Sequence, residues 1–522
     1  MGNPTPKQAV DVDVTYREVR NKLRQYSLHS ILDAALILLN RKLNSLGDEV
    51  QSAPWLILLM VKWALQDKMV NENLGRRITP NEFIAIQQRL WNMERGNGGP
   101  MTTNIFRFIR SLSYVQVQFQ RGETFEFARW PAILSRLSPQ HALRKQFEAE
   151  FGLTPDDFLD LTLAVYGPVV NREGPLAPAY FTALRARYGE KIDTILGLFS
   201  RDVPSLREQL SAEAVKNRHS TQAVLEIPVF SRFPLVRGLN GLYHCWHRKV
   251  FARGVEEFIH NKLSLGGQPY SRSYSEIFED YVVDLAKGTG LLRIDEKGYW
   301  RLVGKDKHAV EAILRDEDCN IFVEAKFGLY QDEYITLDDP EQAWRNLKRF
   351  REAAEKGAAV SDRLASVPEL QDLADRRQDF LLIVTNRQLY IPTGRQVEEI
   401  SSERTQVVDE RARLVMSAKL PVENVFILSL DEFERLMTAV TDKRIRLSEI
   451  LPKLAELVTD PAHWRMDFGQ MMGEFGGMRG FAPLIEQAIE ASMARLAAAL
   501  GQPLNQVPLP WDAAKFVEKA SE

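Results

Sequence analysis

Two short apolar segments joined by a polar turn constrain the fold of this chain more than any other feature. Residues 310–314 read Val-Glu-Ala-Ile-Leu, and residues 321–326 read Ile-Phe-Val-Glu-Ala-Lys. Short runs rich in β-branched and aromatic residues, with turn residues between them, are typical of adjacent strands. Such a hairpin would bring the carboxylates of Glu311 and Glu324 and the ammonium group of Lys326 to one end.

The chemistry at that end favours a divalent cation. Two carboxylates that close repel each other unless a cation lies between them, and Mg²⁺ prefers oxygen ligands. Lys326 follows Glu324 by two residues, so both side chains share one face of the strand. There the ammonium group can orient a water molecule or stabilise charge on a phosphate. The segment therefore predicts a metal-dependent site that cleaves phosphodiesters.

The composition limits the compartment and the partners. A chain of 522 residues predicts about two to four domains. The net charge of −3 indicates no basic body, so nucleic-acid binding would need a local cleft. The two cysteines provide neither a disulfide framework nor a cysteine-based zinc site, which favours the reducing cytoplasm. The longest apolar run, nine residues at 53–61, is too short for a membrane span, and we expect no membrane partner.

The N-terminal part carries apolar stripes at helical spacing from residue 15 to about residue 220. Within it, the segment 79–82 (Thr-Pro-Asn-Glu) combines an N-cap, a proline at the first helical position and a capping box. One exception is expected, because the segments 115–119 and 124–127 alternate in polarity and predict a small hairpin.

The composition changes at the proline-punctuated segment 226–234, which we interpret as a domain boundary. The chain is then expected to have four parts. They are a helical recognition or interaction region at 1–222, a connecting segment at 223–272, a mixed α/β domain at 273–445 and a helical C-terminal region at 446–522.

Beyond residue 272 the pattern is mixed α/β. Ser273 and Glu276 form a capping-box pattern that predicts a helix to about residue 287. Strands are predicted at 291–294, 310–315, 320–327, 380–385 and 425–428, with a helix at 339–356 between the third and the fourth. A second capping box, Ser429 with Glu432, begins the helix after the last strand.

This order of helix, three strands, helix and strand resembles the PD-(D/E)XK nuclease superfamily, also called restriction-endonuclease-like. The matching residues are Glu311 and the Glu-Ala-Lys triplet at 324–326, with twelve residues between the two acids. The resemblance covers about residues 273–430. It implies an α/β nuclease core, with a mixed central sheet flanked by helices, between a large mainly α-helical N-terminal region and a helical C-terminal tail. The combination also resembles large prokaryotic members of the superfamily that act in antiphage defence.

The resemblance implies a role for each matching residue. Glu311, Glu324 and the backbone carbonyl of Ala325 would hold one or two Mg²⁺ or Mn²⁺ ions. Lys326 would position the attacking water or stabilise the charged transition state. Glu279, on the helix ahead of the strands, matches an acid that faces the metal in many members.

Two further positions leave alternatives open. Gln342 matches an active-site glutamine of some members, but Asp339 and Gln342 also make a good capping box. The first acid of the family is normally Asp, whereas this chain has Glu311, whose longer side chain could shift the metal. Asp316 and Asp318 are rival first acids, although their segment reads more like the hairpin turn.

The expected substrate is nucleic acid, DNA in preference to RNA, because the resembled superfamily mostly cuts DNA. Four basic residues on the helix after Gln342 could meet the phosphate backbone: Arg345, Lys348, Arg349 and Arg351. The N-terminal region is expected to recognise nucleic acid or a partner protein, and its local basic residues are Arg76, Arg77, Arg107 and Arg110.

Two other functions compete with the nuclease. The chain could be a non-catalytic scaffold or adaptor of a defence complex that retains a degenerate nuclease fold, which the Asp-to-Glu departure at Glu311 favours. It could also be a nuclease that becomes active only after assembly with a partner. Metal binding separates the scaffold from the other two.

Overall fold

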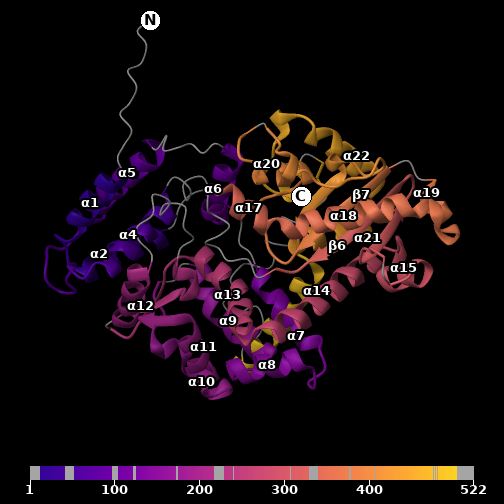
Figure 1. Ribbon diagram of the computed structural model, residues 1–522. Helices are drawn as coiled ribbons and strands as arrows, with labels where there is room; N and C mark the ends of the chain where they lie inside the picture. The colour runs from indigo at the N-terminus through magenta and orange to yellow at the C-terminus, as the bar shows by residue number, and fades with distance from the viewer. Residues whose placement is uncertain are drawn as a thin grey trace, which may run out of the picture. The chain divides into compact units, whose positions relative to one another are not determined.

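The computed structural model describes most of the chain (Figure 1). The described residues are 12–41, 52–96, 104–120, 125–171, 174–216, 229–238, 240–305, 307–328, 339–375, 378–405, 407–473, 475–476, 478 and 480–501. The chain divides into two compact units. Unit 1 comprises Met1–Met101, Val115–Leu265 and Leu484–Glu522, and unit 2 comprises Thr102–Tyr114 and Gly266–Pro483.

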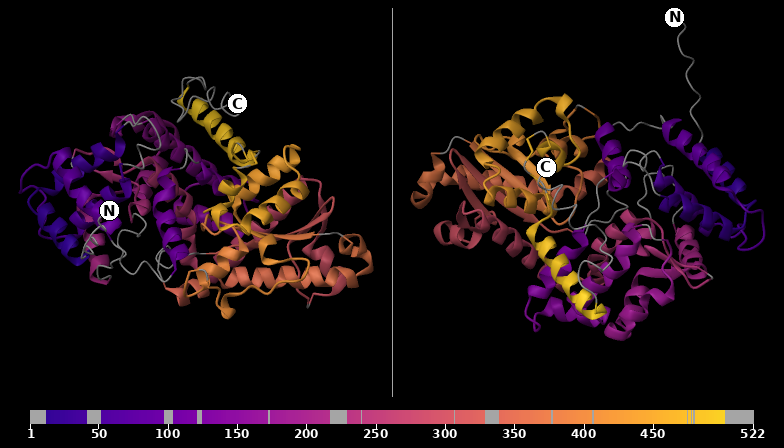
Figure 2. Two further views of the ribbon diagram at one scale, coloured as in Figure 1. Left: turned by 90° about the horizontal axis from the view of Figure 1, so that it is seen from above. Right: turned by 180° about the vertical axis from the view of Figure 1, so that it is seen from behind.

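Unit 1 is mainly helical. Its helices are α1 (Val12–Leu23), α2 (Leu28–Asn40), α4 (Pro54–Gln66), α5 (Pro80–Gly96), the second part of α6 (Ile105–Gln120), α7 (Arg129–Arg136), α8 (Ala142–Phe151), α9 (Pro155–Asn171), α10 (Thr182–Tyr188), α11 (Lys191–Phe199), α12 (Val203–Lys216), α13 (Arg248–Leu263) and α24 (Pro483–Leu500). A small mixed sheet joins β1 (Ser200–Asp202), β2 (Leu235–Arg237) and β3 (Tyr243–Cys245) in that order. Figure 2 shows α24 lengthwise, in yellow.

Aromatic packing forms the core between four of these helices. Phe147, Phe151, Phe158, Phe199 and Phe258 are all buried. The ring centroids of neighbours lie 4.7 Å apart for Phe147 and Phe151 and 5.3 Å apart for Phe199 and Phe258. Tilted and edge-on ring pairs at these distances stabilise a core beyond the area that they bury. This cluster ties α8, α9, α11 and α13 together.

Two local predictions in this region have opposite outcomes. The capping box is confirmed, because the Thr79 hydroxyl accepts the Glu82 amide at 3.2 Å and the Glu82 carboxylate accepts the Thr79 amide at 2.9 Å. The hairpin predicted at 115–119 and 124–127 is wrong, because α6 continues to Gln120 and residues 126–128 form a 3₁₀ turn. The alternation at 115–119 is local, whereas α6 as a whole has an apolar face at helical spacing.

Unit 2 is built on a five-stranded mixed sheet. Its strands are β4 (Leu292–Asp295), β5 (Ala312–Asp316), β6 (Cys319–Lys326), β7 (Gln378–Thr385) and β8 (Val425–Ser429), hydrogen-bonded in that order. Its helices are α14 (Gln268–Gly288), α15 (Glu296–Val303), α17 (Pro340–Asn346), α18 (Lys348–Arg363), α19 (Gln371–Ala374), α20 (Gly394–Ser401), α21 (Leu430–Thr441), α22 (Leu447–Val458) and α23 (Phe468–Met472).

The sheet changes character at β6. Pairing is antiparallel from β4 through β6 and parallel from β6 through β8. Every residue of β8 is buried, as is all of β7 after Gln378, as expected for parallel strands covered on both faces. Helix α18 lies across β6 and β7 (Figure 1). It approaches closely at Gly357, where a Cβ atom would lie 3.1 Å from Leu381. Helices α14 and α21 pack on each other and on the sheet.

The structure is therefore mainly helical with two mixed sheets, and the strand order of unit 2 follows the sequence prediction closely. The predicted capping box at Ser273 is wrong, because α14 begins at Gln268 and contains Ser273. The box at Ser429 and Glu432 is confirmed. The four-part division of the chain stays a prediction; its segment 273–445 lies wholly within unit 2.

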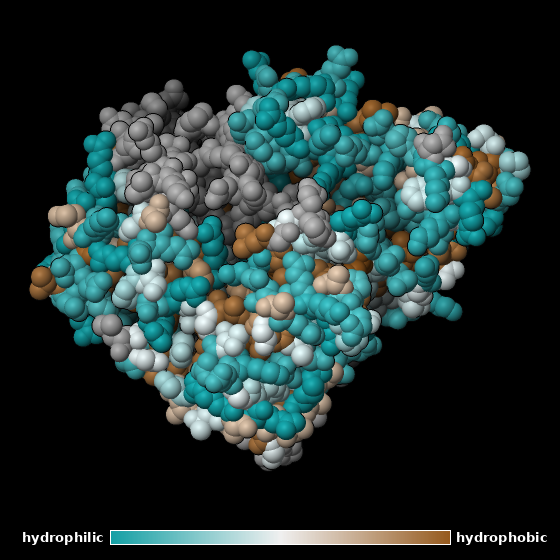
Figure 3. Space-filling view, turned by 60° about the horizontal axis from the view of Figure 1, so that its bottom comes forward, coloured by the Kyte–Doolittle hydropathy of each residue, from teal (hydrophilic) through white to brown (hydrophobic). Residues whose placement is uncertain are grey.

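The face of the molecule shown in Figure 3 is largely hydrophilic, with hydrophobic residues in small separate groups. Among the helices that the structure describes, none is long and apolar enough to cross a bilayer.

Candidate active site

Strand register brings the two predicted metal-binding acids together. Strands β5 and β6 are antiparallel, and Ala312 lies opposite Val323. Glu311 directly precedes β5. Continued by one step, the same pairing would set it opposite Glu324, and the two carboxyl groups lie close enough to share a hydrogen bond. The structure thus places this pair on one side of the sheet, as the hairpin predicted.

Both carboxylates are buried, Glu311 at 8 % exposure and Glu324 at 0 %. Glu311 accepts the backbone amide of Ala325 at 3.2 Å. Oε1 of Glu324 accepts hydrogen bonds from Lys326 and, at 2.8 Å, from Lys356. Oε2 of Glu324 is buried and receives no hydrogen bond from an N–H group or hydroxyl of the described residues. A proton on Glu311 would supply one.

The electrostatics of the pair follow from this geometry. Burial raises the pKa of Glu311 well above its ordinary value, and the neighbouring charge of Glu324 raises it further. Burial also opposes ionisation of Glu324, but a hydrogen bond from Glu311 and the charges of Lys326 and Lys356 together lower its pKa. The charge of Glu324 raises the pKa of Lys356 against the effect of burial. Without a cation, the pair therefore favours one shared proton.

The donor set fits a magnesium-type ion that keeps part of its water shell. Among the described residues, no group of three or more His, Cys, Asp or Glu side chains has metal-binding geometry. Mg²⁺, however, is commonly held by one or two carboxylates together with waters and substrate phosphates. The acceptor Oε2 of Glu324, buried next to a second carboxylate, is the kind of atom that such an ion would satisfy.

Glu279 on α14 joins the electrostatic neighbourhood of the pair. Its carboxylate accepts a hydrogen bond from the Ser275 hydroxyl at 2.8 Å. Burial raises the pKa of Glu279; the charges of Lys326 and Lys356 act to lower it, and that of Glu324 acts to raise it. The structure therefore brings the predicted helix acid near the pair.

Two residues that the sequence did not reveal also belong here, Glu296 and Lys356. Glu296 begins α15 directly after β4, and its amide donates to the carbonyl of Glu311 at 3.0 Å. Burial raises the pKa of Glu296, with opposing effects from Lys356 and Glu324. A signal for Lys356 was present in the sequence, because it stands beside the small buried residues Ala353 and Gly357 that mark the sheet-facing side of α18.

Gln342 is not drawn into these interactions. Asp339 caps α17 by accepting the amides of Glu341 and Gln342 at 2.9 and 3.1 Å. The Gln342 side chain donates to Asn346 at 3.0 Å, within the same helix. Asp339 thus caps α17, but the reciprocal bond from the Asp339 amide to the Gln342 side chain, which a capping box requires, is not among the hydrogen bonds of the described residues.

The rival first acids lie at the turn end of the hairpin. Asp316 pairs with Cys319 on β6. Cys319 lies five residues before Glu324, which at about 3.3 Å per residue is roughly 16 Å along the strand. The Asp316 carboxylate accepts the amide of Ser448 at 2.9 Å. Asp318 follows in the turn itself. The acid opposite Glu324 is therefore Glu311.

The basic residues of α17 and α18 have local partners. Arg345 pairs with Glu341 at 3.1 Å, and Lys348 pairs with Glu352 at 3.3 Å. Arg349 donates to the carbonyl of Phe327, directly after β6. Arg351 lies over the Trp344 ring, 4.3 Å from its centroid. Exposed pairs of this kind are weak, so phosphates could compete for Arg345 and Lys348.

Two of the arginines suggested as a basic surface are buried instead. Arg107 and Arg110 are 3 % and 4 % exposed. Arg107 donates to the carbonyls of Ile400 and Ser402, and Arg110 donates to that of Leu389 at 3.0 Å. These guanidinium groups satisfy backbone acceptors inside unit 2, so the prediction that they form a basic surface is wrong.

Comparisons with models of protein families, with curated proteins and with solved structures give no match for this chain. Its function is therefore inferred from the geometry of the site.

Proposed function

We propose that unit 2 is a metal-dependent nuclease of the PD-(D/E)XK type and that DNA is its substrate. The observation that carries the proposal is the buried pair of Glu311, directly before β5, and Glu324, on β6; one oxygen of Glu324 receives no hydrogen bond from an N–H group or hydroxyl of the described residues. The mixed sheet with three antiparallel and two further parallel strands supports the same assignment. A role in prokaryotic antiphage defence rests on the sequence resemblance alone.

Each residue of the site has its own role in the proposed reaction. Glu311, Glu324 and the carbonyl of Ala325 would hold Mg²⁺ or Mn²⁺. When bound, that ion would polarise the scissile phosphate and lower the pKa of a water molecule. Lys326, 15 % exposed at its side chain, can turn from Glu324 toward a phosphate oxygen and stabilise its charge. Lys356 keeps Glu324 ionised, because its ammonium group is 2.8 Å from Oε1.

A second candidate is the non-catalytic scaffold. One observation favours it specifically, since two ammonium groups already neutralise Glu324. In that case the pair and its lysines are a closed buried network, and no cation is required. The two candidates differ in whether the purified chain binds a divalent cation.

The experiment combines cleavage with metal binding. Supercoiled plasmid DNA is incubated with the full chain in Mg²⁺ or Mn²⁺, and Mn²⁺ binding is measured by calorimetry. The variants are Glu324→Gln and Lys326→Met, and the matched control is Glu276→Gln, an exposed glutamate on α14. We expect cleavage by the wild type and the control, no cleavage by the two variants, and loss of Mn²⁺ binding in Glu324→Gln.

Two outcomes would contradict the nuclease. A folded wild type that neither binds Mn²⁺ nor cleaves DNA points to the scaffold. Cleavage that survives in both variants places the activity outside this site. A wild type that binds Mn²⁺ through Glu324 but does not cleave retains the metal site and points to a nuclease that needs a partner.

A further inference from the structure

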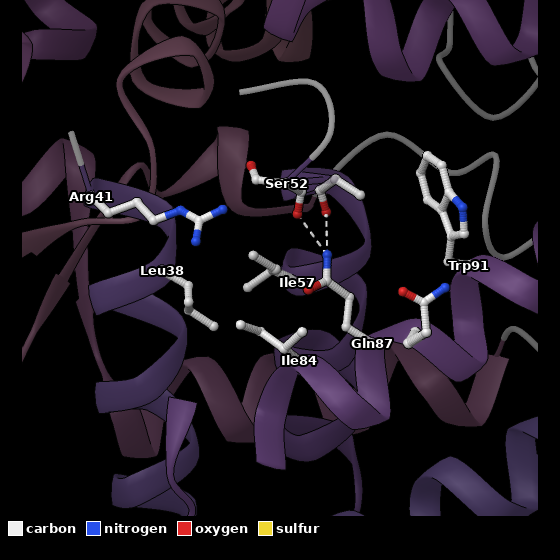
Figure 4. Close-up of a pocket in the computed structure, with 9 residues that line it drawn as sticks. Leu38, Arg41, Ser52, Ile57, Ile84, Gln87 and Trp91 are labelled. Atoms are coloured by element: carbon white, nitrogen blue, oxygen red, sulfur yellow. Dashed lines mark hydrogen bonds between the residues drawn. The ribbon is translucent and has the colours of Figure 1, made fainter. Parts of the chain in front are cut away.

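A cavity of about 230 Å³ opens within unit 1 between α2, α4 and α5. Leu38, Ile57 and Ile84 give it an apolar wall (Figure 4). Leu38 and Ile57 are buried, whereas Ile84 remains 39 % exposed at the rim. The cavity can therefore receive the apolar body of a small ligand from solvent.

Gln87 fixes a hydrogen-bond acceptor in this cavity. Its side chain is only 9 % exposed, and its amide nitrogen donates to the carbonyls of Ser52 at 2.6 Å and Ala53 at 3.2 Å. Carbonyls only accept, so the two bonds determine which amide atom is the oxygen. No described residue donates to that Oε1. A ligand with an N–H or O–H group would satisfy it.

The same two bonds hold a strained backbone. Ala53 has a φ of +47°, in the left-handed region, which is unfavourable for a residue with a Cβ. Proline follows at the first position of α4. Gln87 thus holds the carbonyls on both sides of this kink in the cavity wall. Backbone strain of this kind is concentrated at binding sites.

The two sides of the cavity differ in chemistry. Figure 4 shows Arg41 extending toward Ser52 on one side of Gln87, and Trp91 on the other side. The Trp91 ring lies 6.2 Å from that of Trp55, centroid to centroid, and is tilted by 38°. A guanidinium group recognises phosphate, and an indole face supports stacking of a planar ring.

We infer that this cavity binds a nucleotide, with the base next to Trp91 and Gln87 and the phosphate toward Arg41. A nucleobase supplies both the planar ring that stacks on indole and the ring N–H groups that Gln87 can accept. The cavity volume of about 230 Å³ lies below the roughly 300–1,000 Å³ of sites for drug-sized ligands, so the cavity encloses only part of a nucleotide and the phosphate lies at the exposed Arg41. The cavity lies wholly within unit 1, and the inference does not depend on the nuclease proposal.

Calorimetry on the full chain tests the inference with AMP, GMP, CMP and UMP, and with adenosine and inorganic phosphate as half-ligands. We expect at least one mononucleotide to bind more tightly than either half. Arg41→Gln should weaken mononucleotide binding about tenfold and leave adenosine binding unchanged. Trp91→Leu should weaken both, and the control Arg187→Gln, on α10, should weaken neither.

A single-stranded oligonucleotide with a 5′-phosphate distinguishes the source of the ligand. Binding of mononucleotides alone identifies a free nucleotide, and tighter binding of the oligonucleotide identifies the end of a strand. The inference is overturned if no mononucleotide binds at millimolar concentration, or if inorganic phosphate binds as tightly as the nucleotides. It is also overturned if Arg41→Gln weakens adenosine and mononucleotides equally, since the arginine would then act only on the fold.

Discussion

Each unit contains a buried carboxylate next to basic side chains. The two carboxylates differ in how many of their oxygens accept hydrogen bonds from these neighbours. In unit 1, Asp160 on α9 is 2 % exposed and accepts hydrogen bonds from Arg495, Ser492 and Tyr188. Arg495 reaches both of its oxygens, at 2.7 and 2.9 Å. In unit 2, Glu324 concentrates two ammonium groups on one oxygen and leaves the other against Glu311.

The difference separates a structural ion pair from a site that can act. A buried carboxylate whose oxygens are all bonded has no capacity for another ligand, and it joins the elements that provide its partners. A buried carboxylate with a spare acceptor and a like-charged neighbour is unfavourable until a proton or a cation arrives. Natural proteins keep such local conflicts mainly where they serve a function.

The largest effect is expected from Glu311→Gln. If the pair holds the metal, this variant should lose about a thousandfold in DNA cleavage, the scale on which removal of a key electrostatic group acts. In the metal-free protein the amide would keep the hydrogen bond to Glu324 that the shared proton provides. Urea denaturation should therefore show a change of less than about 1 kcal/mol in the free energy of unfolding. A loss of both activity and stability would show that Glu311 is structural.

Asp160→Ala should instead lower the stability of the protein. It removes the acceptor that Arg495 and Ser492 share, although Arg495 keeps its pair with Asp156 at 3.5 Å. Because Asp160 is buried while Arg495 is 37 % exposed, the variant should lower the free energy of unfolding by about 2–3 kcal/mol. The matched control is Asp193→Ala, which removes an exposed pair with Arg185 and should cost less than about 1 kcal/mol. Equal losses in thermal or urea denaturation would remove the distinction between the two pairs.

A third carboxylate extends the comparison to pH. Glu399 on α20 is half-buried, and burial raises its pKa to about 7 from the ordinary 4.5, against the charge of Arg395. Because the folded value is raised, the contribution to stability is complete below pH 4.5 and is lost as pH rises through 7. Glu399→Gln should therefore be more stable than the wild type by about 2 kcal/mol at pH 8.5, with little difference at pH 5.

The matched control for that measurement is Glu403→Gln, an exposed position shortly after α20. It should follow the wild type at both pH values. A pH-independent difference between Glu399→Gln and the wild type would mean that the carboxyl group does not titrate differently in the folded protein.

The smallest change in the free energy of unfolding is expected for a substitution in the cavity wall of unit 1. Ala53→Gly relieves the left-handed backbone at a φ of +47°, but glycine also loses more entropy on folding, so we expect a gain of at most about 1 kcal/mol. Ala64→Gly, at a buried interior position of α4, should instead lose about 1 kcal/mol. Two equal losses in urea denaturation would show that the kink at Ala53 is not strained.

The local sequence pattern was sufficient to predict the strands of the unit 2 sheet. The apolar runs at 310–315 and 320–327 lie within about two residues of β5 and β6, and alternation fixed which acids oppose each other. Capping chemistry located the starts of α5 and α21, because Thr79 and Ser429 bond within their own first turns. These features depend on neighbours in sequence, so a single sequence reveals them.

The features that the sequence did not predict depend on contacts between residues far apart in the chain. Lys356 reaches Glu324 only because α18 packs across the sheet. The small buried residues beside Lys356 mark the packed side of the helix, but they do not show which strand residue it meets. Alternation predicted strands at 115–119, whereas burial around α6 supports a helix. The bond between Arg495 and Asp160 joins residues 335 apart, and nothing in either segment points to the other.

That separation has a consequence for synthesis of the chain. Helix α9 leaves the ribosome long before α24, and unit 1 is interrupted by most of unit 2. At about 5–20 residues per second, the 335 residues between Asp160 and Arg495 take roughly 15–70 s to make. During that interval a nascent unit 1 would hold a carboxylate that lacks its guanidinium partner. Complete folding of unit 1 therefore has to wait for the end of translation, whereas the five-stranded sheet can form before it.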